Sequence, residues 1–283
     1  MGIYTICNEL IKGISEEIKN NDSSISTGYH DFDSLLRGGF KDGMLYVLAS
    51  RPGMGKSALA LNIAMHILGR EKKIVYFNVE STMRHQLSKM ICLDAGIETG
   101  NTKDYTNEEL DAIDEAAKHI AGMNFIINDD ESPDIDQIYG VMSDYPCSDA
   151  DMIIIDYLQL LTSAWDRSGE LHGGHDNEME YICRRLKLLA KKLDIPILVL
   201  SQLSKDIEYR DDKHPGISDL IEPTGMDAYA DVIMLLYRDD HYNEDSELKG
   251  IAEINIVKNH FGRTGVCRLV YIMQMMKFVN IYR

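Results

Sequence analysis

The segment Ser-Arg-Pro-Gly-Met-Gly-Lys-Ser, which starts at Ser50, has the residue types and spacing of a loop that binds phosphate groups. In a glycine-rich turn that opens a helix, backbone N–H groups and the positive end of the helix dipole face a polyphosphate. Lys56 would reach the β and γ oxygens, and Ser57 would hold magnesium. Ser50 replaces the first glycine of the usual pattern, so the turn depends on Gly53 and Gly55. The residues predicted to bind nucleotide are Ser50, Arg51, Pro52, Gly53, Met54, Gly55, Lys56, Ser57 and Ala58.

Two carboxylates complete the chemistry that this loop requires. Asp156 closes the apolar run 152–155, where a buried strand can carry it to a magnesium ion opposite Ser57. Hydrolysis also needs a carboxylate to orient or deprotonate water, but Tyr157 follows Asp156. We therefore expect Glu80, at the end of another strand, to be the base, although its position also fits a helix cap or a solvated charge.

Two polar segments follow further apolar runs. Gln202 lies at the end of a predicted strand, where a sensor of the γ-phosphate is expected, although its amide could equally cap its own loop. Residues 164–176 are rich in glycine and include Trp165 and Arg167, which predicts a loop on the same side that could contact a polymer.

Strand and helix patterns alternate along the chain and predict an α/β fold with a mostly parallel central sheet flanked by helices. The catalytic groups would then lie at the carboxyl ends of the strands. Predicted strands cover 44–49, 73–79, 124–127, 152–155, 195–200, 230–237, 251–257 and 266–272, the last two as an antiparallel hairpin. Predicted helices cover 58–68, 83–95, 107–121 and 178–193, with a further one after Pro133.

The N-terminal region is predicted to be separate from this domain. Apolar residues at steps of three and four predict an amphipathic helix over 3–19, and a polar stretch follows it. We therefore divide the chain into a linker region, 1–24, and one domain, 25–283. The helix would fold back on its own domain or dock on a neighbouring subunit.

Composition narrows the class of protein. The 283 residues have no apolar run of membrane-spanning length, and the five cysteines lack C-x-x-C spacing, so we expect a cytoplasmic protein without disulfides or structural zinc. The net charge of −17 argues against tight binding of nucleic acid. That argument weakens if basic groups gather on one surface, such as the inside of a ring.

Taken in order, the motifs resemble the C-terminal motor domain of DnaB-type replicative helicases over about residues 25–272. The resemblance is carried by Ser50-Arg-Pro-Gly-Met-Gly-Lys-Ser-Ala58, Asp156-Tyr-Leu-Gln-Leu160, Arg184-Arg-Leu-Lys-Leu-Leu-Ala190, Ile195-Pro-Ile-Leu-Val-Leu-Ser-Gln-Leu203, Ser218-Asp-Leu220, Ala230-Asp-Val232, Tyr237-Arg-Asp-Asp240 and Lys258 with Gly262 and Gly265. It implies a RecA-like P-loop NTPase fold and a hexameric ring that binds ATP and Mg²⁺ between subunits and moves along single-stranded DNA. A primase or a loader protein would be a partner, and the helix at 3–19 would be the linker to an N-terminal domain that this form lacks.

The same resemblance assigns roles to individual residues. Asp156 matches the magnesium carboxylate, Glu80 the general base and Gln202 the sensor glutamine. Arg238 matches a residue that binds the nucleotide, and Lys56 the lysine of the phosphate loop.

Two positions depart from the family pattern. The family has an arginine two residues after Lys258, which reaches the neighbour's γ-phosphate, and this chain has His260 there. Either Lys258 serves alone, or Arg263 in the same turn substitutes, or catalysis across the interface is weak. In the loop that faces DNA, Ile221 replaces a basic residue, which removes an expected phosphate contact.

These departures leave two other functions open. The first is a DNA-independent oligomeric ATPase, or a module in which nucleotide controls binding to a protein partner. The second is a protein similar to strand-exchange recombinases, which the segments at 237–240 and 258–265 fit less well.

Overall fold

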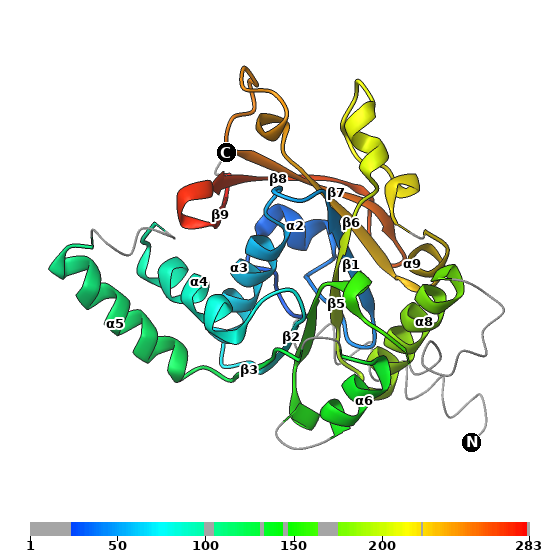
Figure 1. Cartoon of the computed structure of the whole chain (residues 1–283), viewed down its shortest axis with the longest axis horizontal. Helices are drawn as coiled ribbons and strands as arrows, with labels where there is room; N and C mark the ends of the chain where they lie inside the picture. The colour runs from blue at the N-terminus through cyan, green and yellow to red at the C-terminus, as the bar shows by residue number, and fades with distance from the viewer. Residues whose placement is uncertain are drawn as a thin grey trace.

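The computed structural model describes residues 24–98, 105–130, 133–143, 147–163, 175–221 and 223–281. The predicted helix at 3–19 and most of the predicted loop at 164–176 lie outside these residues. A central sheet runs through the molecule, with helices on both of its faces (Figure 1). No helix of the described part is both long and apolar enough to cross a membrane.

The sheet of the described chain has nine strands in the order β3-β2-β4-β5-β1-β6-β7-β8-β9. The strands are β1 Leu45–Ser50, β2 Ile74–Asn78, β3 Phe125–Asn128, β4 Met152–Asp156, β5 Ile197–Gln202, β6 Val232–Tyr237, β7 Ile251–Asn259, β8 Gly265–Ile272 and β9 Lys277–Asn280. Pairing is parallel from β3 to β6 and antiparallel from β6 to β9. The mostly parallel sheet and the C-terminal hairpin are confirmed, and β9 adds a strand that the sequence did not predict.

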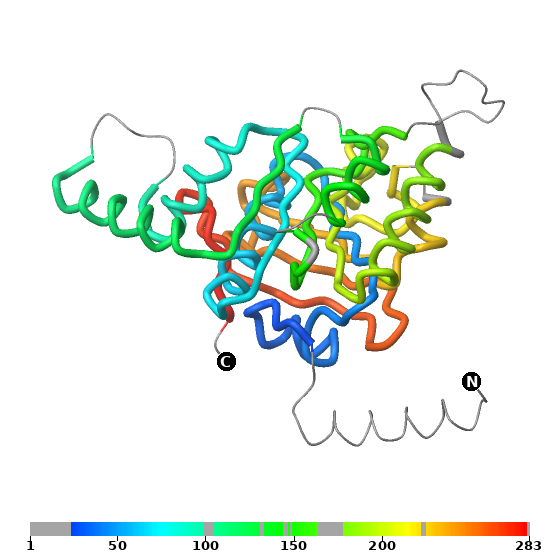
Figure 2. The backbone as a smooth tube through the Cα atoms, turned by 90° about the horizontal axis from the view of Figure 1, so that it is seen from below, coloured from blue at the N-terminus to red at the C-terminus, as the bar shows by residue number. Residues whose placement is uncertain are grey.

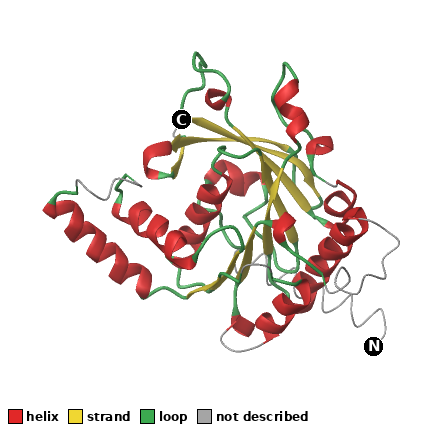
Figure 3. Cartoon of the chain, viewed as in Figure 1, coloured by secondary structure: helices red, strands yellow, loops and turns green. Residues whose placement is uncertain are grey.

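Two apolar layers cover the parallel part of the sheet, and Figure 3 shows the strands between them. The helices are α2 His30–Leu35, α3 Lys56–Leu68, α4 Met83–Ala95, α5 Asn107–Ala121, α6 Ile135–Ser143, α8 His175–Leu193 and α9 Pro223–Tyr229. Residues of α3 and α4 pack with one face of the sheet, and residues of α6 and α8 with the other. Strands β1, β2, β4 and β6 are buried along their whole length because helices cover both faces. Figure 2 shows α4 and α5 together at one end of the molecule.

The boundaries of β5 and α8 differ from the predicted ones. The strand predicted from Ile195 begins at Ile197, because Pro196 has no N–H to donate to a neighbouring strand. The strand then continues to Gln202, which makes this residue its last. Helix α8 begins at His175, three residues before the predicted start at Glu178.

The register of the parallel strands aligns their carboxyl ends. Ser50 at the end of β1 pairs with Gln202 at the end of β5. Asn78 at the end of β2 pairs with Asp156 at the end of β4. Polar side chains from separate parts of the sequence therefore meet at one edge of the sheet.

Candidate active site

The loop between β1 and α3 has the backbone geometry of a phosphate-binding turn. Gly55 is the N-cap of α3 with φ of 97°, and Gly53 has φ of 81°. The positive φ at Gly53 favours glycine, and a Cβ atom there would lie 2.8 Å from the ring of His241, an exposed side chain that would have to shift. Ser50 belongs to β1 and is fully buried, and it does not have positive φ. A glycine is therefore not needed at this place.

A pocket of about 300 Å³ opens at this edge of the sheet and contains most of the predicted site. The described residues that line it are Ser50, Arg51, Pro52, Gly53, Gly55, Lys56, Ser57, Ala58, Glu80, Gln202, Tyr271 and Met276. Glu80 and Gln202 thus face the same space as the phosphate loop. The side chain of Met54, by contrast, is buried in the core at 1% exposure, so only its backbone is available to a ligand.

Lys56 and Asp156 form a buried ion pair next to the pocket. The Lys56 Nζ lies 3.5 Å from Asp156 Oδ1, and the two side chains are 10% and 3% exposed. Burial lowers the pKa of Lys56, and the nearby carboxylates of Asp156 and Glu80 partly oppose this shift. The ammonium also lies 5.1 Å from the centre of the Tyr157 ring. Lys56 is therefore held at one position at the start of α3.

The two oxygens of Asp156 have different partners: Oδ2 is hydrogen-bonded, and Oδ1 faces the Lys56 ammonium at 3.5 Å. Tyr76 on β2 donates its hydroxyl proton to Asp156 Oδ2 at 3.0 Å. Among the described residues, Asp156 Oδ1 is buried and has no hydrogen-bond partner. A buried carboxylate oxygen with no hydrogen bond, and only the Lys56 ammonium near it, is suited to a hard cation, and the hydroxyl of Ser57, which lines the pocket, could be a second oxygen ligand. These residues fit magnesium.

Glu80 lies two residues beyond β2 and is exposed. It does not cap the helix that follows, because Thr82 is the N-cap of α4 and accepts the amide proton of His85. The interpretation of Glu80 as a helix cap is therefore wrong. Burial raises the pKa of Tyr157, and the charges of Glu80 and Asp156 raise it further. Both carboxylates are therefore close enough to Tyr157 to affect its ionisation. A carboxylate facing the pocket without a capping role is available to a water molecule.

Gln202 is held in place by a glutamine that the sequence did not single out. Gln159 accepts the amide proton of Gln202 at 3.2 Å and donates to the hydroxyl of Ser201 at 2.8 Å. The side chain of Gln202 meanwhile lines the pocket. Gln159 lies three residues after Asp156, and only the pairing of β4 with β5 shows that it supports Gln202.

Two arginines, one within the phosphate loop and one outside it, make different contacts. Arg51 donates from Nε to Glu208 at 2.8 Å and from Nη1 to the carbonyl of Leu203 at 2.8 Å. Arg238 is 2% exposed and is not among the residues that line the pocket. Its guanidinium pairs with Asp240 at 3.0 Å and donates to the carbonyl of Gly53 at 3.4 Å. Arg238 therefore supports the phosphate loop through the carbonyl of Gly53, on the side away from the pocket.

The remaining predicted residues lie at the other end of the sheet. Asn259 at the end of β7 pairs with Val232 at the start of β6, whereas the phosphate loop follows the end of the parallel strand β1. Lys258, His260 and Arg263 are therefore distant from the pocket of their own chain.

These three side chains have different surroundings. Lys258 contacts the carbonyl of Asp227 and lies 4.0 Å from its carboxylate. His260 Nδ1 lies 3.5 Å from Asp231 Oδ1. Arg263 is exposed, and no ion pair of the described residues involves it. Its guanidinium is thus available to another molecule.

Comparison with known proteins places these features in context. The family model described as DnaB-like helicase C-terminal domain matches residues 24–280. The chain is 34% identical over 275 residues to the replicative DNA helicase DnaB of Geobacillus stearothermophilus, covering 95% of this chain and 60% of that protein. It is 32% identical over 269 residues to the replicative DNA helicase DnaC of Bacillus subtilis, covering 94% of this chain and 58% of the relative.

Solved structures agree with this family match. A structure described as an ATPase domain superposes with a TM-score of 0.89 at 29% identity, covering 97% of this chain and 98% of that one. A DnaB-like replicative helicase, described with its interactions with primase, gives 0.86 at 29% identity and covers 97% and 67%. The RadB recombinase, at 20% identity and a TM-score of 0.58, shares the fold. The chain spans about 60% of the length of the curated relatives.

Proposed function

The chain belongs to the family of DnaB-like helicase C-terminal domains, and from this premise we propose that it is an ATP-driven motor of DNA replication. As one subunit of a hexameric ring it would hydrolyse ATP and move along single-stranded DNA. The observation that carries this proposal is the pocket that holds the phosphate loop, Glu80 and Gln202 next to the Lys56–Asp156 pair. This set of groups supplies phosphate binding, a base and a sensor in one place.

Binding of the triphosphate depends on groups that are already in position. The backbone N–H groups at the start of α3 and the ammonium of Lys56 would contact the β- and γ-phosphates. Magnesium, when bound by Ser57 and Asp156, supplies positive charge to the phosphate oxygens. Tyr76 orients Asp156 by its hydrogen bond to Oδ2, and Oδ1, which lies 3.5 Å from Lys56 Nζ, would be the oxygen that binds the ion.

Glu80 would orient the attacking water and accept its proton. Its exposed carboxylate faces the pocket and does not cap α4, so it is available for this role. Gln202 would hydrogen-bond the γ-phosphate, since its side chain faces the same space while Gln159 holds its backbone. Loss of the γ-phosphate would then remove this hydrogen bond and change the contacts at the end of β5.

The cation that acts across the subunit interface would be Arg263. It is exposed and has no ion pair within the described part of the chain, whereas Lys258 and His260 face acidic partners of their own chain. A guanidinium also keeps its charge at neutral pH and offers several donors, which suits the charge of the transition state. Arg263 would thus complete the site of the neighbouring subunit.

The larger assembly belongs to the same proposal. Residues 1–24 would form a linker helix and a polar linker that contact the ring, and 25–283 the motor. A relative of known structure is described with its interactions with primase, so a primase or a loader protein is a suitable partner here as well. Such a machine would work in the cytoplasm, on replicating DNA.

The net charge of −17 and the apolar Ile221 favour a second candidate, an oligomeric ATPase that does not depend on DNA. Steady-state ATPase, measured with and without single-stranded DNA, separates the two functions. The helicase motor predicts stimulation by DNA and binding that weakens as salt rises. Turnover that ignores DNA, with no binding at low ionic strength, would leave the second candidate.

A further inference from the structure

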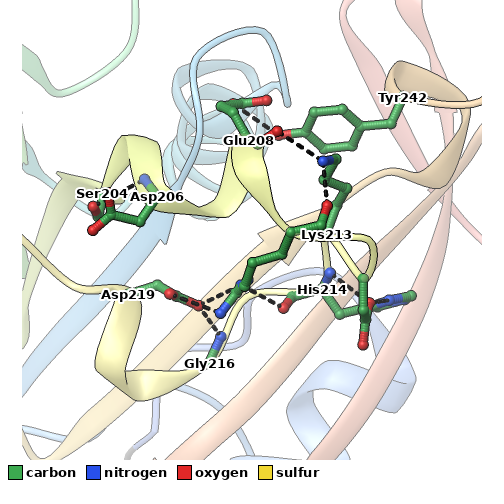
Figure 4. Close-up of polar contacts among 10 residues, drawn as sticks. Ser204, Asp206, Glu208, Lys213, His214, Gly216, Asp219 and Tyr242 are labelled. Carbon is green, nitrogen blue, oxygen red and sulfur yellow. Dashed lines mark hydrogen bonds and ion pairs between the residues drawn. The ribbon is translucent and has the colours of Figure 1, made fainter.

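Residues 203–220 form a closed loop between β5 and the segment that starts at Ile221, and Figure 4 shows its polar contacts. The two ends of this loop pair with each other through an antiparallel bridge between Leu203 and Leu220. Ser204 also donates its amide proton to the carbonyl of Asp219 at 2.7 Å. The loop therefore leaves the sheet and returns to the same point.

The buried carboxylate of Asp219 accepts hydrogen bonds from other residues of loop 203–220. Arg210 contacts both oxygens of Asp219, at 3.1 and 2.9 Å, and Gly216 donates its amide proton to Oδ2 at 2.8 Å. Asp219 is only 5% exposed, so these bonds are shielded from water. None of them involves the phosphate loop. These bonds hold loop 203–220 together internally, while Ile207, buried in the core, and His214, 3.3 Å from Glu253, join it to the rest of the domain.

Arg51, in the phosphate loop, links that loop to loop 203–220. Its guanidinium donates to Glu208 and to the carbonyl of Leu203, each at 2.8 Å, and the side chain is 13% exposed. Glu208 lies in the 3₁₀ turn η3, Lys205–Tyr209, near the middle of loop 203–220. The Arg51 guanidinium keeps the pKa of Glu208 below its usual range, so the carboxylate stays ionised at neutral pH.

Glu208 also reaches the opposite flank of the phosphate loop. Its Oε1 accepts the hydroxyl proton of Tyr242 at 3.1 Å (Figure 4). Tyr242 packs edge-on against His241, and the ring of His241 lies against Gly53. One carboxylate thus joins loop 203–220 to both sides of the turn that would hold phosphate.

We propose that Arg51 is a positioning residue, which through Glu208 makes loop 203–220 follow the state of the phosphate loop and carries that state to the segment at Ile221. Two donors of its guanidinium, Nε and Nη1, are committed to loop 203–220, which gives this side chain a positioning role beside the pocket that it lines. A shift of the backbone at Arg51 changes both bonds together. This inference rests on the proposed function only where it assigns the segment after Leu220 to DNA.

Hydrogen exchange measured by mass spectrometry, with and without a non-hydrolysable ATP analogue, tests the proposal. In the wild type the analogue should slow exchange in residues 204–219 by about fivefold or more, because an ordered phosphate loop stabilises the bonds of Arg51 to this loop. In Glu208→Ala this protection should be lost, although α3 still gains protection when the analogue binds. Tyr242→Phe, which keeps the ring but loses one bond to Glu208, should lose part of the protection.

Asp206→Asn is the matched control. Asp206 lies in the same 3₁₀ turn, and no ion pair of the described residues involves it. Its substitution removes a carboxylate from loop 203–220 without touching Arg51, so protection by the analogue should match that of the wild type.

Three outcomes would overturn the proposal. One is a wild-type loop whose exchange does not respond to the analogue although α3 is protected by it, and another is a Glu208→Ala loop that responds as the wild type does. The third is Arg51→Met that loses analogue binding while Glu208→Ala binds normally, which would make Arg51 a direct ligand. Since these measurements need neither DNA nor turnover, a failure of the proposed motor function would be recognised separately, by the DNA-stimulated ATPase.

Discussion

At the scale of single residues, the groups that would bind phosphate differ from the group that would activate water. Lys56 is buried, paired with Asp156 and packed near an aromatic ring, so its position is fixed before any ligand arrives. Glu80 is exposed, lies after the end of β2, and its carboxylate does not cap α4. A change at Glu80 should therefore alter turnover and leave the binding groups intact.

Glu80→Gln is expected to bind ATP with wild-type affinity and to turn over at least ~100-fold more slowly, because an amide cannot accept the proton of water. Binding of a fluorescent ATP analogue and steady-state ATPase give the two quantities. Glu71→Gln, a substitution of an exposed carboxylate distant from the pocket, is the control and should turn over normally. Wild-type turnover in Glu80→Gln would show that another group is the base.

At the scale of elements, the phosphate loop is shaped by its neighbours as much as by its own glycines. The ring of His241, in the 3₁₀ turn after β6, occupies the space beside Gly53, and Arg238 holds the carbonyl of that residue. The segment at 238–241 therefore limits the conformations that the loop can adopt. This contact joins two parts of the chain that are far apart in sequence.

Gly53→Ala should destabilise the protein by about 1–2 kcal/mol, because alanine resists the positive φ and its Cβ would meet the His241 ring. Nucleotide affinity should fall as well. Adding His241→Ala should restore the steric part of the loss and leave the part due to φ, which chemical denaturation and analogue binding can resolve. Equal stability of the single and double variants would mean that the ring does not constrain the loop.

The strands also show how much of the fold and of the site could be predicted from the sequence. Strands β1, β2, β4 and β5 follow from short apolar runs, and their common direction was enough to place Glu80 and Gln202 near Lys56. Strand β9 was missed because it has four residues and only one of them is fully buried, so no apolar pattern marks it.

The supporting residues could not be found in the same way. Tyr76 and Gln159 act through the register of β4 with its neighbours, which single-sequence spacing does not contain. The partner of Arg51 is 157 positions away, and Glu208 carries no motif of its own. Such contacts follow from tertiary packing, and the chain sequence indicates them only after the fold is known.

At the scale of the whole molecule, the phosphate loop and Arg263 lie at opposite ends of the sheet. A ring in which each chain presents one end to the next would bring the two together at every interface. Mixing variants tests this arrangement. Lys56→Ala and Arg263→Ala should each lower ATPase by about 10³-fold when assembled alone.

A mixture of the two variants should regain part of the activity. Where an Arg263→Ala subunit contributes the loop and a Lys56→Ala subunit contributes Arg263, the site is complete. Lys258→Ala mixed with Lys56→Ala gives the comparison for the neighbouring cation. No recovery in the Arg263 mixture, with rings verified by mass, would show that Arg263 does not act across the interface.

The charge of the molecule bears on DNA. Because the net charge is −17, adding one basic side chain near Ile221, in the segment proposed to face DNA, should change DNA affinity by a measurable amount. Ile221→Arg should strengthen binding of single-stranded DNA a few-fold and steepen its salt dependence by about one unit of slope. Ile217→Arg, at an exposed position of the neighbouring loop, is the control and should have a smaller effect. Equal effects of the two variants would indicate general charge compensation.

The distance between Lys56 and Arg263 on one chain has a kinetic consequence. If every working site is built from two chains, an isolated chain hydrolyses ATP only at a residual rate, and the reaction becomes second order in protein at high dilution. Activity per chain should then rise in proportion to concentration until the interfaces saturate. Dilution alone would stop the motor and concentration would restart it, with every chain folded throughout.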